Sequence, residues 1–107
     1  MSDVAIGDGN LAGKGVYANR DFAKDEIVIQ YHLTPLTDDE FDRLPASEKM
    51  FAHVHWGQIY FYGEPERYVN HAEEANTVQD LQRRCDVALR DILKGEMITT
   101  DATKDDV

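Results

Sequence analysis

The segment from residue 88 to residue 96 reads Ala88-Leu89-Arg90-Asp91-Ile92-Leu93-Lys94-Gly95-Glu96. Gly95 suits a turn position with positive φ, which glycine adopts without steric cost. We expect Ile92 to be a core residue and the charged neighbours Arg90 and Asp91 to pair locally. A strand is expected over 96–99, so this segment predicts a turn that leads into a strand.

Two further segments lie upstream of that turn. One is Arg67-Tyr68-Val69-Asn70-His71, followed by Asn76-Thr77, and the other is Gly13-Lys14-Gly15-Val16-Tyr17-Ala18. An asparagine amide offers both a donor and an acceptor, so Asn70 suits a buried structural role as well as a ligand contact. Glycines let a backbone approach a ligand closely. A Gly-x-Gly pair alone, however, is more typical of a hairpin turn.

Taken in their order along the chain and at these gaps, the three segments resemble a SET domain. This is the fold of protein lysine methyltransferases that use S-adenosylmethionine (SAM). The resemblance runs from about Leu11 to Asp101. It implies a mainly β protein with short helices, a β-clip-like fold of several small sheets with a knot-like crossing near the C-terminus. We expect a single minimal SET domain over 1–107, with a turn or strand over 1–10 and a loose tail over 103–107.

The resemblance also implies a cofactor site. In the family, the glycine loop cradles the methionine end of SAM, and the Asn-His pair contacts the cofactor's amine and adenine. The predicted cofactor-binding residues are Lys14, Gly15, Val16, Tyr17, Arg67, Tyr68, Asn70 and His71. The family usually has Ser-Cys-x-Pro between the histidine and the next asparagine, whereas this chain has Ala72-Glu73-Glu74-Ala75.

Methyl transfer to lysine determines what the catalytic residues must do. The lysine nitrogen must lose its proton, which costs about 4 kcal/mol at neutral pH for a free lysine. The resemblance implies a narrow channel lined with tyrosines, and the candidates are Tyr31, Tyr62 and Tyr17, although Leu33 replaces a glycine usual in the family. From the residues alone, Tyr60, Phe61 and Tyr62 are equally core aromatics of a half-buried strand, with Phe61 on the opposite face.

One residue of the family pattern is missing. The family normally has Asp-Tyr after the closing strand, and this chain has Asp101-Ala102. Two functions therefore stay open. The first is a SAM-dependent methyltransferase acting on a lysine of a basic protein, which the glycine loop and Asn70-His71 favour. The second is a weak or inactive SET-fold module that binds SAM or a protein partner, which Ala102 favours.

Composition limits the partners. The formal net charge of −10 argues against nucleic acid, because its binders are normally basic, and it would attract a basic protein. Cys85 is the only cysteine, which excludes an intrachain disulfide and a cysteine zinc site. Its neighbours Arg83 and Arg84 could lower its pKa, although a buried structural cysteine fits better. His53 and His55 share a strand face without a third ligand, so we expect no metal.

The sequence also gives expectations for cellular location and assembly. No signal peptide or membrane-spanning stretch is evident, so we expect a cytoplasmic protein without a membrane partner. A minimal SET domain leaves apolar surface uncovered, so we expect a symmetric homodimer.

Local patterns predict most of the elements. Strands are expected over 16–18, 26–31, 53–56 and 58–62, with a turn over 7–10 and another at Gly57. Thr37 and Glu40 form a capping box that begins a short helix, with Phe41 and Leu44 inward. Pro45 either ends this helix or restarts a second turn through Lys49. Over 78–92 the apolar spacing is helical, but the resemblance implies a strand over 86–90, which we follow, with a helical turn over 77–83. We find no internal repeat.

Overall fold

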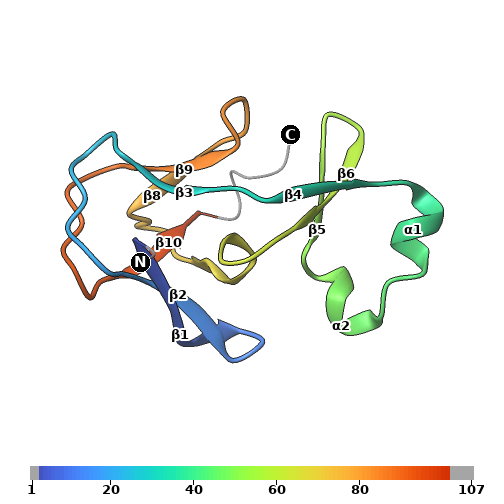
Figure 1. The fold of residues 1–107 in the computed structure, drawn as a ribbon, viewed down its shortest axis with the longest axis horizontal. Coiled ribbons are helices and arrows are strands. Elements are labelled where there is room, and N and C mark those ends of the chain that lie inside the picture. Colours follow the sequence, from blue (N-terminus) through green and yellow to red (C-terminus); the bar gives the residue numbers. More distant parts are fainter. Residues whose placement is uncertain (1–2, 102–107) are drawn as a thin grey trace.

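The computed structural model describes residues 3–101, which form two β-sheets along the long axis of a molecule measuring 41 × 27 × 27 Å (Figure 1). The larger sheet has the order β1 (Val4–Leu11), β2 (Lys14–Ala18), β10 (Met97–Thr100), β8 (Thr77–Asp80), β9 (Cys85–Ala88) and β3 (Ile27–Gln30). The short strand β7 (Asn70–His71) pairs with β10 in parallel. The smaller sheet has the order β4 (Leu33–Leu36), β6 (Gln58–Tyr62) and β5 (Ala52–His55).

Helix is scarce. Two short α-helices, α1 (Asp38–Asp42) and α2 (Ala46–Lys49), connect β4 to β5, and a 3₁₀ turn, η1 (Glu66–Tyr68), precedes β7. The mainly β fold with short helices is therefore confirmed. No helix within residues 3–101 has the length and apolarity that crossing a membrane requires.

The first hairpin differs from the prediction. Residues 7–10 are not a turn, because β1 continues through them to Leu11 with an irregularity between Asp8 and Leu11. The chain turns at Ala12 and Gly13, where φ is 54° and 79°. Pairing with β2 explains the longer strand, since the hydrogen bonds of the ladder compensate for the low strand propensity of glycine.

The capping box at the start of α1 is confirmed. The backbone N–H of Glu40 donates to Thr37 Oγ1 at 3.2 Å, and the Glu40 carboxylate accepts from the Thr37 N–H at 3.0 Å. The second contact is the main reason why the pKa of Glu40 lies below its ordinary value. Phe41 and Leu44, expected on an inner face, are only half-buried, because α1 lies at the edge of the molecule.

The region after residue 76 is a hairpin of β8 and β9 instead of a helix, with Thr77 opposite Ala88 and Asp80 opposite Cys85. The helical turn expected over 77–83 is wrong, and the strand expected over 86–90 lies at 85–88. All four residues of β9 are buried, so they carry no alternation that would mark a strand. Val78, on the expected helical face, is 39% exposed.

Two connections repeat one another, contrary to the sequence expectation. Arg20-Asp21-Phe22-Ala23-Lys24-Asp25-Glu26 and Arg90-Asp91-Ile92-Leu93-Lys94-Gly95-Glu96 have Arg, Asp, Lys and Glu at matching places. In each copy the glutamate accepts from the arginine and from the backbone N–H three residues before it. Each aspartate accepts from the backbone N–H of the other copy's lysine. Arg90 thus forms its ion pair with Glu96 instead of Asp91.

This repeat organises the core. Phe22 and Ile92 occupy matching positions, and their backbones exchange hydrogen bonds at 2.8 and 2.9 Å. Their side chains are 2% and 0% exposed and pack with Val16 and Ile98, which are fully buried. The core position predicted for Ile92 and the positive φ predicted for Gly95 are confirmed.

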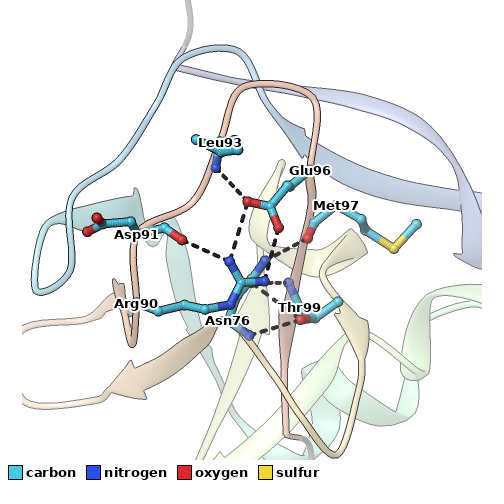
Figure 2. Close-up of polar contacts among 7 residues, drawn as sticks. All are labelled: Asn76, Arg90, Asp91, Leu93, Glu96, Met97 and Thr99. Carbon is cyan, nitrogen blue, oxygen red and sulfur yellow. Dashed lines mark hydrogen bonds and ion pairs between the residues drawn. The ribbon is translucent and has the colours of Figure 1, made fainter.

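The contacts of Glu96 make acid stability testable (Figure 2). Arg90 first, and then the Leu93 N–H, hold the pKa of Glu96 below its ordinary value. This stability is therefore present above the unfolded-state pKa of about 4.3 and is lost as the pH falls through the lower folded-state pKa. We expect Glu96→Gln to lower the free energy of unfolding at neutral pH by at most about 1 kcal/mol, since the side chain is 33% exposed and solvent screens the pair.

Urea unfolding at neutral pH and at about pH 3 measures this difference. The effect of Glu96→Gln should shrink at the lower pH. Glu73→Gln, on an exposed loop, is the control for the change in charge. An effect of Glu96→Gln that is the same at both pH values would contradict the assignment.

Candidate functional site

Asn70 joins segments that lie 60 positions apart in the sequence. Its Oδ1 accepts from the backbone N–H of Asn10 at 2.7 Å, and its Nδ2 donates to the carbonyl oxygens of Lys14 at 2.9 Å and Tyr68 at 2.8 Å. The residue is 4% exposed. Because the amide uses both donor and acceptor on backbone groups, Asn70 holds the β1–β2 hairpin against η1 and β7.

The two glycines of the predicted loop have different roles. At Gly13, with φ of 79°, no atom of residues 3–101 lies within 4 Å of the position a Cβ would take. At Gly15, a Cβ would lie 3.1 Å from the Asp8 carbonyl oxygen and 3.3 Å from Asn70 Nδ2, so this glycine permits close packing. The Lys14 ammonium lies 4.9 Å from the Tyr68 ring centroid. Val16 is fully buried in the core.

Arg67 connects elements that surround the site. Its Nε donates to the Tyr62 carbonyl oxygen at 3.0 Å, and its guanidinium forms an ion pair with Glu48 at 3.4 Å. The same group lies 4.7 Å from the Phe61 ring centroid. Its side chain is 15% exposed, so Arg67 mainly connects η1 with β6 and α2.

Asn76 fixes the other end of this region (Figure 2). Its Nδ2 donates to the Met97 carbonyl oxygen at 2.8 Å, and its Oδ1 accepts from the Thr99 N–H at 2.8 Å. The side chain thus pairs with β10 as a strand backbone would. Asn70 and Asn76 together hold both ends of the 70–76 segment while leaving His71 45% exposed.

A cavity of about 150 Å³ lies next to Asn70 and is lined in part by Leu11, Val69 and His71. Its apolar wall consists of Leu11, Met50, Phe51 and Val69. Its polar wall consists of His53, Tyr62, Glu66, Arg67, His71, Gln79, Asp86 and Thr100. The cavity therefore combines residues from β1, β5–β10 and η1, and it contains three of the predicted site residues, Tyr62, Arg67 and His71.

The structure brings two of the three candidate tyrosines together. The rings of Tyr31 and Tyr62 have centroids 5.5 Å apart, and both residues are buried. The Tyr31 hydroxyl donates to the Asp86 carboxylate, and the Tyr62 hydroxyl bonds His55 Nε2 at 2.6 Å. Tyr17 does not line the cavity, and its hydroxyl donates to the Asp8 carbonyl oxygen at 2.6 Å on the hairpin.

Comparison with known proteins identifies the fold family. The family model for the SET domain matches residues 13–101. The chain belongs to the SET domain family. Members of this family include protein lysine methyltransferases, which generally use SAM. No significant match to a curated protein was found.

Solved structures agree with this SET domain. A Plasmodium falciparum protein described as a histone methyltransferase superposes with a TM-score of 0.74 at 16% identity, over 95% of this chain and 94% of that chain. A humanized mutant of the Chaetomium thermophilum Polycomb Repressive Complex 2, bound to an inhibitor, superposes with a TM-score of 0.73 at 25% identity. That match covers 94% of this chain and only 15% of the Polycomb chain.

Two weaker sequence signals were the histidine pair His53 and His55 and the single cysteine Cys85. His53 and His55 stack with centroids 6.4 Å apart, and His55 is 1% exposed. Residues 3–101 contain no group of three His, Cys, Asp or Glu side chains arranged to hold a metal. Burial raises the pKa of the Cys85 thiol and outweighs the opposing effect of Arg83, so the lowered pKa considered from the sequence is wrong.

Sequence reasoning missed four polar residues of the cavity, Glu66, Gln79, Asp86 and Thr100. Asp86 is 2% exposed, and Gln79 lies directly opposite it on β8. The signal that could have found Asp86 is a charged residue inside the run Cys85-Asp86-Val87-Ala88, which otherwise consists of residues that prefer the interior. Only the cross-strand pairing reveals Gln79.

Proposed function

We propose that this SET domain binds SAM and transfers its methyl group to a lysine side chain of a basic protein. The observation that carries this proposal is the set of three hydrogen bonds of the Asn70 side chain, which we call the Asn70 clamp. It closes the glycine-containing hairpin onto η1 and β7 next to the cavity. The family and the resemblance of the fold to a protein described as a histone methyltransferase support the reaction class.

The residues present suit the chemistry of SAM, which when bound supplies a methyl group on a positively charged sulfur. Asp86 provides a buried carboxylate in the cavity, and the Gln79 carbonyl provides a buried acceptor. Lys14 provides a cation beside the open backbone of Gly13 that can receive a carboxylate. We infer that Lys14, Gly15, Tyr68 and His71 would hold the cofactor, with Asn70 acting through the backbone.

The chain's own residues also suit the lysine. Tyr62 lines the cavity, and its buried ring packs against the buried ring of Tyr31 with centroids 5.5 Å apart, which makes this wall aromatic. An apolar environment disfavours the charged form of an amine and so lowers its pKa, which helps the nitrogen to become nucleophilic. The net charge of −10 attracts a lysine-rich partner and speeds its encounter.

A second function, binding without efficient transfer, is favoured by Ala102, which lies outside the described residues. Calorimetry with SAM and a radiolabelled-methyl assay on histones separate the two. Binding with transfer supports the enzyme, and binding without transfer supports the module. No SAM binding by a folded chain would overturn the enzyme and leave only a module that binds a protein partner. The single-domain extent over 1–107, the cytoplasmic location and the homodimer stay predictions.

Ala102→Tyr tests whether the missing hydroxyl limits turnover. Removing one positioned hydrogen-bond donor from other active sites costs about 100- to 1000-fold in turnover. We therefore expect Ala102→Tyr to raise methyl transfer by up to about that factor, with SAM affinity little changed. Ala102→Phe adds the ring without the hydroxyl and is the control. Equal rates for the two variants would show that the hydroxyl does not matter.

A further inference from the structure

Three adjacent strands of the larger sheet carry a strip of apolar residues on one face. In β3, β9 and β8, which lie side by side (Figure 1), Ile27 is paired with Val87 and Val87 with Val78. Residues paired across antiparallel strands point to the same face of the sheet. Leu89 follows Val87 by two positions on the same face, and its backbone N–H donates to the Asn76 carbonyl oxygen at 2.9 Å. We call Ile27, Val87, Val78 and Leu89 the outer strip.

The outer strip is exposed, whereas the opposite face of the same strands is buried. Ile27, Val78 and Leu89 are 42%, 39% and 46% exposed. On the opposite face, Thr77 and Ala88 are paired with each other, and each is 1% exposed. Single exposed apolar side chains are ordinary on a protein surface, but neighbouring ones on one face of a sheet mark an interaction site. The charges beside the strip indicate the kind of partner.

A groove of about 180 Å³ adjoins the outer strip and carries only negative charge. Val78 and Leu89 line it together with Glu73, Glu74 and Asp101, and its described lining includes no lysine, arginine or histidine. Asp101 has a histidine neighbour outside the groove at 3.7 Å. Glu73 and Glu74 are exposed, and neither forms an ion pair or a side-chain hydrogen bond with another residue of 3–101. The groove therefore combines apolar side chains with two carboxylates that have no cation.

The state of its carboxylates distinguishes this groove from a second acidic groove. The second groove is lined by Asp21, Glu26 and Asp91, which accept hydrogen bonds from backbone N–H groups and from an arginine within the repeat. Glu73 and Glu74 have no such donors, so their charge is available to a cation from outside. A second copy of this chain, with its net charge of −10, is disfavoured as a partner by repulsion, and so is a nucleic acid.

We propose that the outer strip and this groove dock a segment of a partner protein that carries apolar side chains next to lysine or arginine. The apolar side chains cover Val78 and Leu89, and the cations pair with Glu73 and Glu74. A cavity of about 150 Å³ in another protein accommodates benzene, so a groove of about 180 Å³ accepts one apolar side chain.

This docking site goes beyond the proposed function. Gln79 and Thr100 line both the groove and the cavity, but no residue of the outer strip lines the cavity. Docking therefore requires neither SAM nor methyl transfer.

The test titrates a short peptide of alternating leucine and lysine into the full chain without SAM and follows the NMR signals of the valine and leucine methyl groups. We expect saturable binding that shifts the signals of Val78 and Leu89 and leaves those of Val54, which is 50% exposed on β5, unchanged. A peptide with serine in place of leucine should bind about 10-fold more weakly or worse. A peptide with glutamate in place of lysine should not bind.

Variants of the chain separate the two parts of the site. Leu89→Gln should weaken binding of the leucine-lysine peptide by about 5-fold or more, because the apolar contact is lost. The double variant Glu73→Gln, Glu74→Gln should weaken it by about 3-fold or more, the effect expected for two exposed ion pairs.

Matched controls change the same residue types elsewhere on the surface. Val54→Gln removes an exposed apolar side chain from the smaller sheet, and Asp38→Asn with Asp42→Asn removes two exposed carboxylates from α1. Each should change the affinity by less than about 2-fold. A loss for the α1 variant equal to that for the Glu73 and Glu74 variant would reduce the binding to net charge and overturn the docking site.

Three other results would overturn it: no peptide binding by the folded chain, equal binding of the serine peptide, and methyl shifts as large at Val54 as at Val78 and Leu89. If Leu89→Gln does not fold by circular dichroism, the methyl shifts of the unmodified chain decide. Docking by a chain that binds no SAM in calorimetry would keep this site and remove the proposed function. Methyl transfer without docking would do the reverse.

Discussion

Asn70→Ala lowers the free energy of unfolding by about 3–5 kcal/mol and removes detectable SAM binding. The substitution leaves the Asn10 N–H and the Lys14 and Tyr68 carbonyl oxygens without their partner. Each buried group left unpaired costs about 1–3 kcal/mol, and partial access of water keeps the total below the sum. Since a domain of this size has a net stability of about 5–15 kcal/mol, the loss is a large fraction of it.

Urea unfolding measures the stability, and calorimetry with SAM measures the binding. Asn10→Ala is the matched control, because it removes an exposed amide at the same contact and leaves the backbone N–H that donates to Asn70. It should change the stability by no more than about 0.5 kcal/mol. An Asn70→Ala chain as stable as Asn10→Ala would show that the clamp does not hold the hairpin.

Gly9→Ala has the second large expected effect, a loss of about 3 kcal/mol. A Cβ on residue 9 would lie 2.4 Å from the Lys14 carbonyl oxygen and 2.6 Å from the Gly15 nitrogen. These are backbone atoms, so no side chain can rotate away and the hairpin itself must open. Opening also strains the hydrogen bond from the Gly9 N–H to the Gly13 carbonyl oxygen. We expect SAM affinity to fall together with stability, because Lys14 moves.

Gly13→Ala separates packing from backbone conformation within the same hairpin. Its Cβ would enter open space, so only the positive φ opposes the substitution, at a cost of about 1–2 kcal/mol. Most SAM affinity should remain, because the hairpin stays against Asn70. Urea unfolding and calorimetry on both variants provide the comparison. A larger loss of stability for Gly13→Ala than for Gly9→Ala would contradict this account.

Several features could be predicted from local sequence because their causes are local. The capping box at Thr37 and Glu40 depends on residues three positions apart. The turns at Gly57 and Gly95 need positive φ, which the residue type itself supplies. The order of the glycine segment, Asn70-His71 and the turn at Gly95 was enough to indicate the SET family, and the family match confirms it.

Other features depend on contacts between distant residues. Tyr17 and Tyr62 are equivalent as residue types, yet the first bonds the hairpin and the second lines the cavity. The buried strand β9 lacks the alternation of a strand, so local spacing wrongly favoured a helix there. The repeat of residues 20–26 and 90–96 is visible in the sequence. Only the structure shows that the two copies bond to each other, because Asp21 and Asp91 each accept a hydrogen bond from the lysine N–H of the other copy.

Sequence alone therefore established the family, the turns and the residue types available at the candidate site. Tertiary structure added which of them meet: Asn70 with the hairpin, Tyr31 with Tyr62, and Gln79 with Asp86. The physical reason is that strand register and core packing determine the distances between residues that lie dozens of positions apart in the sequence. Local propensity does not determine such distances. Burial also left the Gln79 Oε1 atom without a hydrogen-bond partner among residues 3–101, which the residue type alone does not reveal.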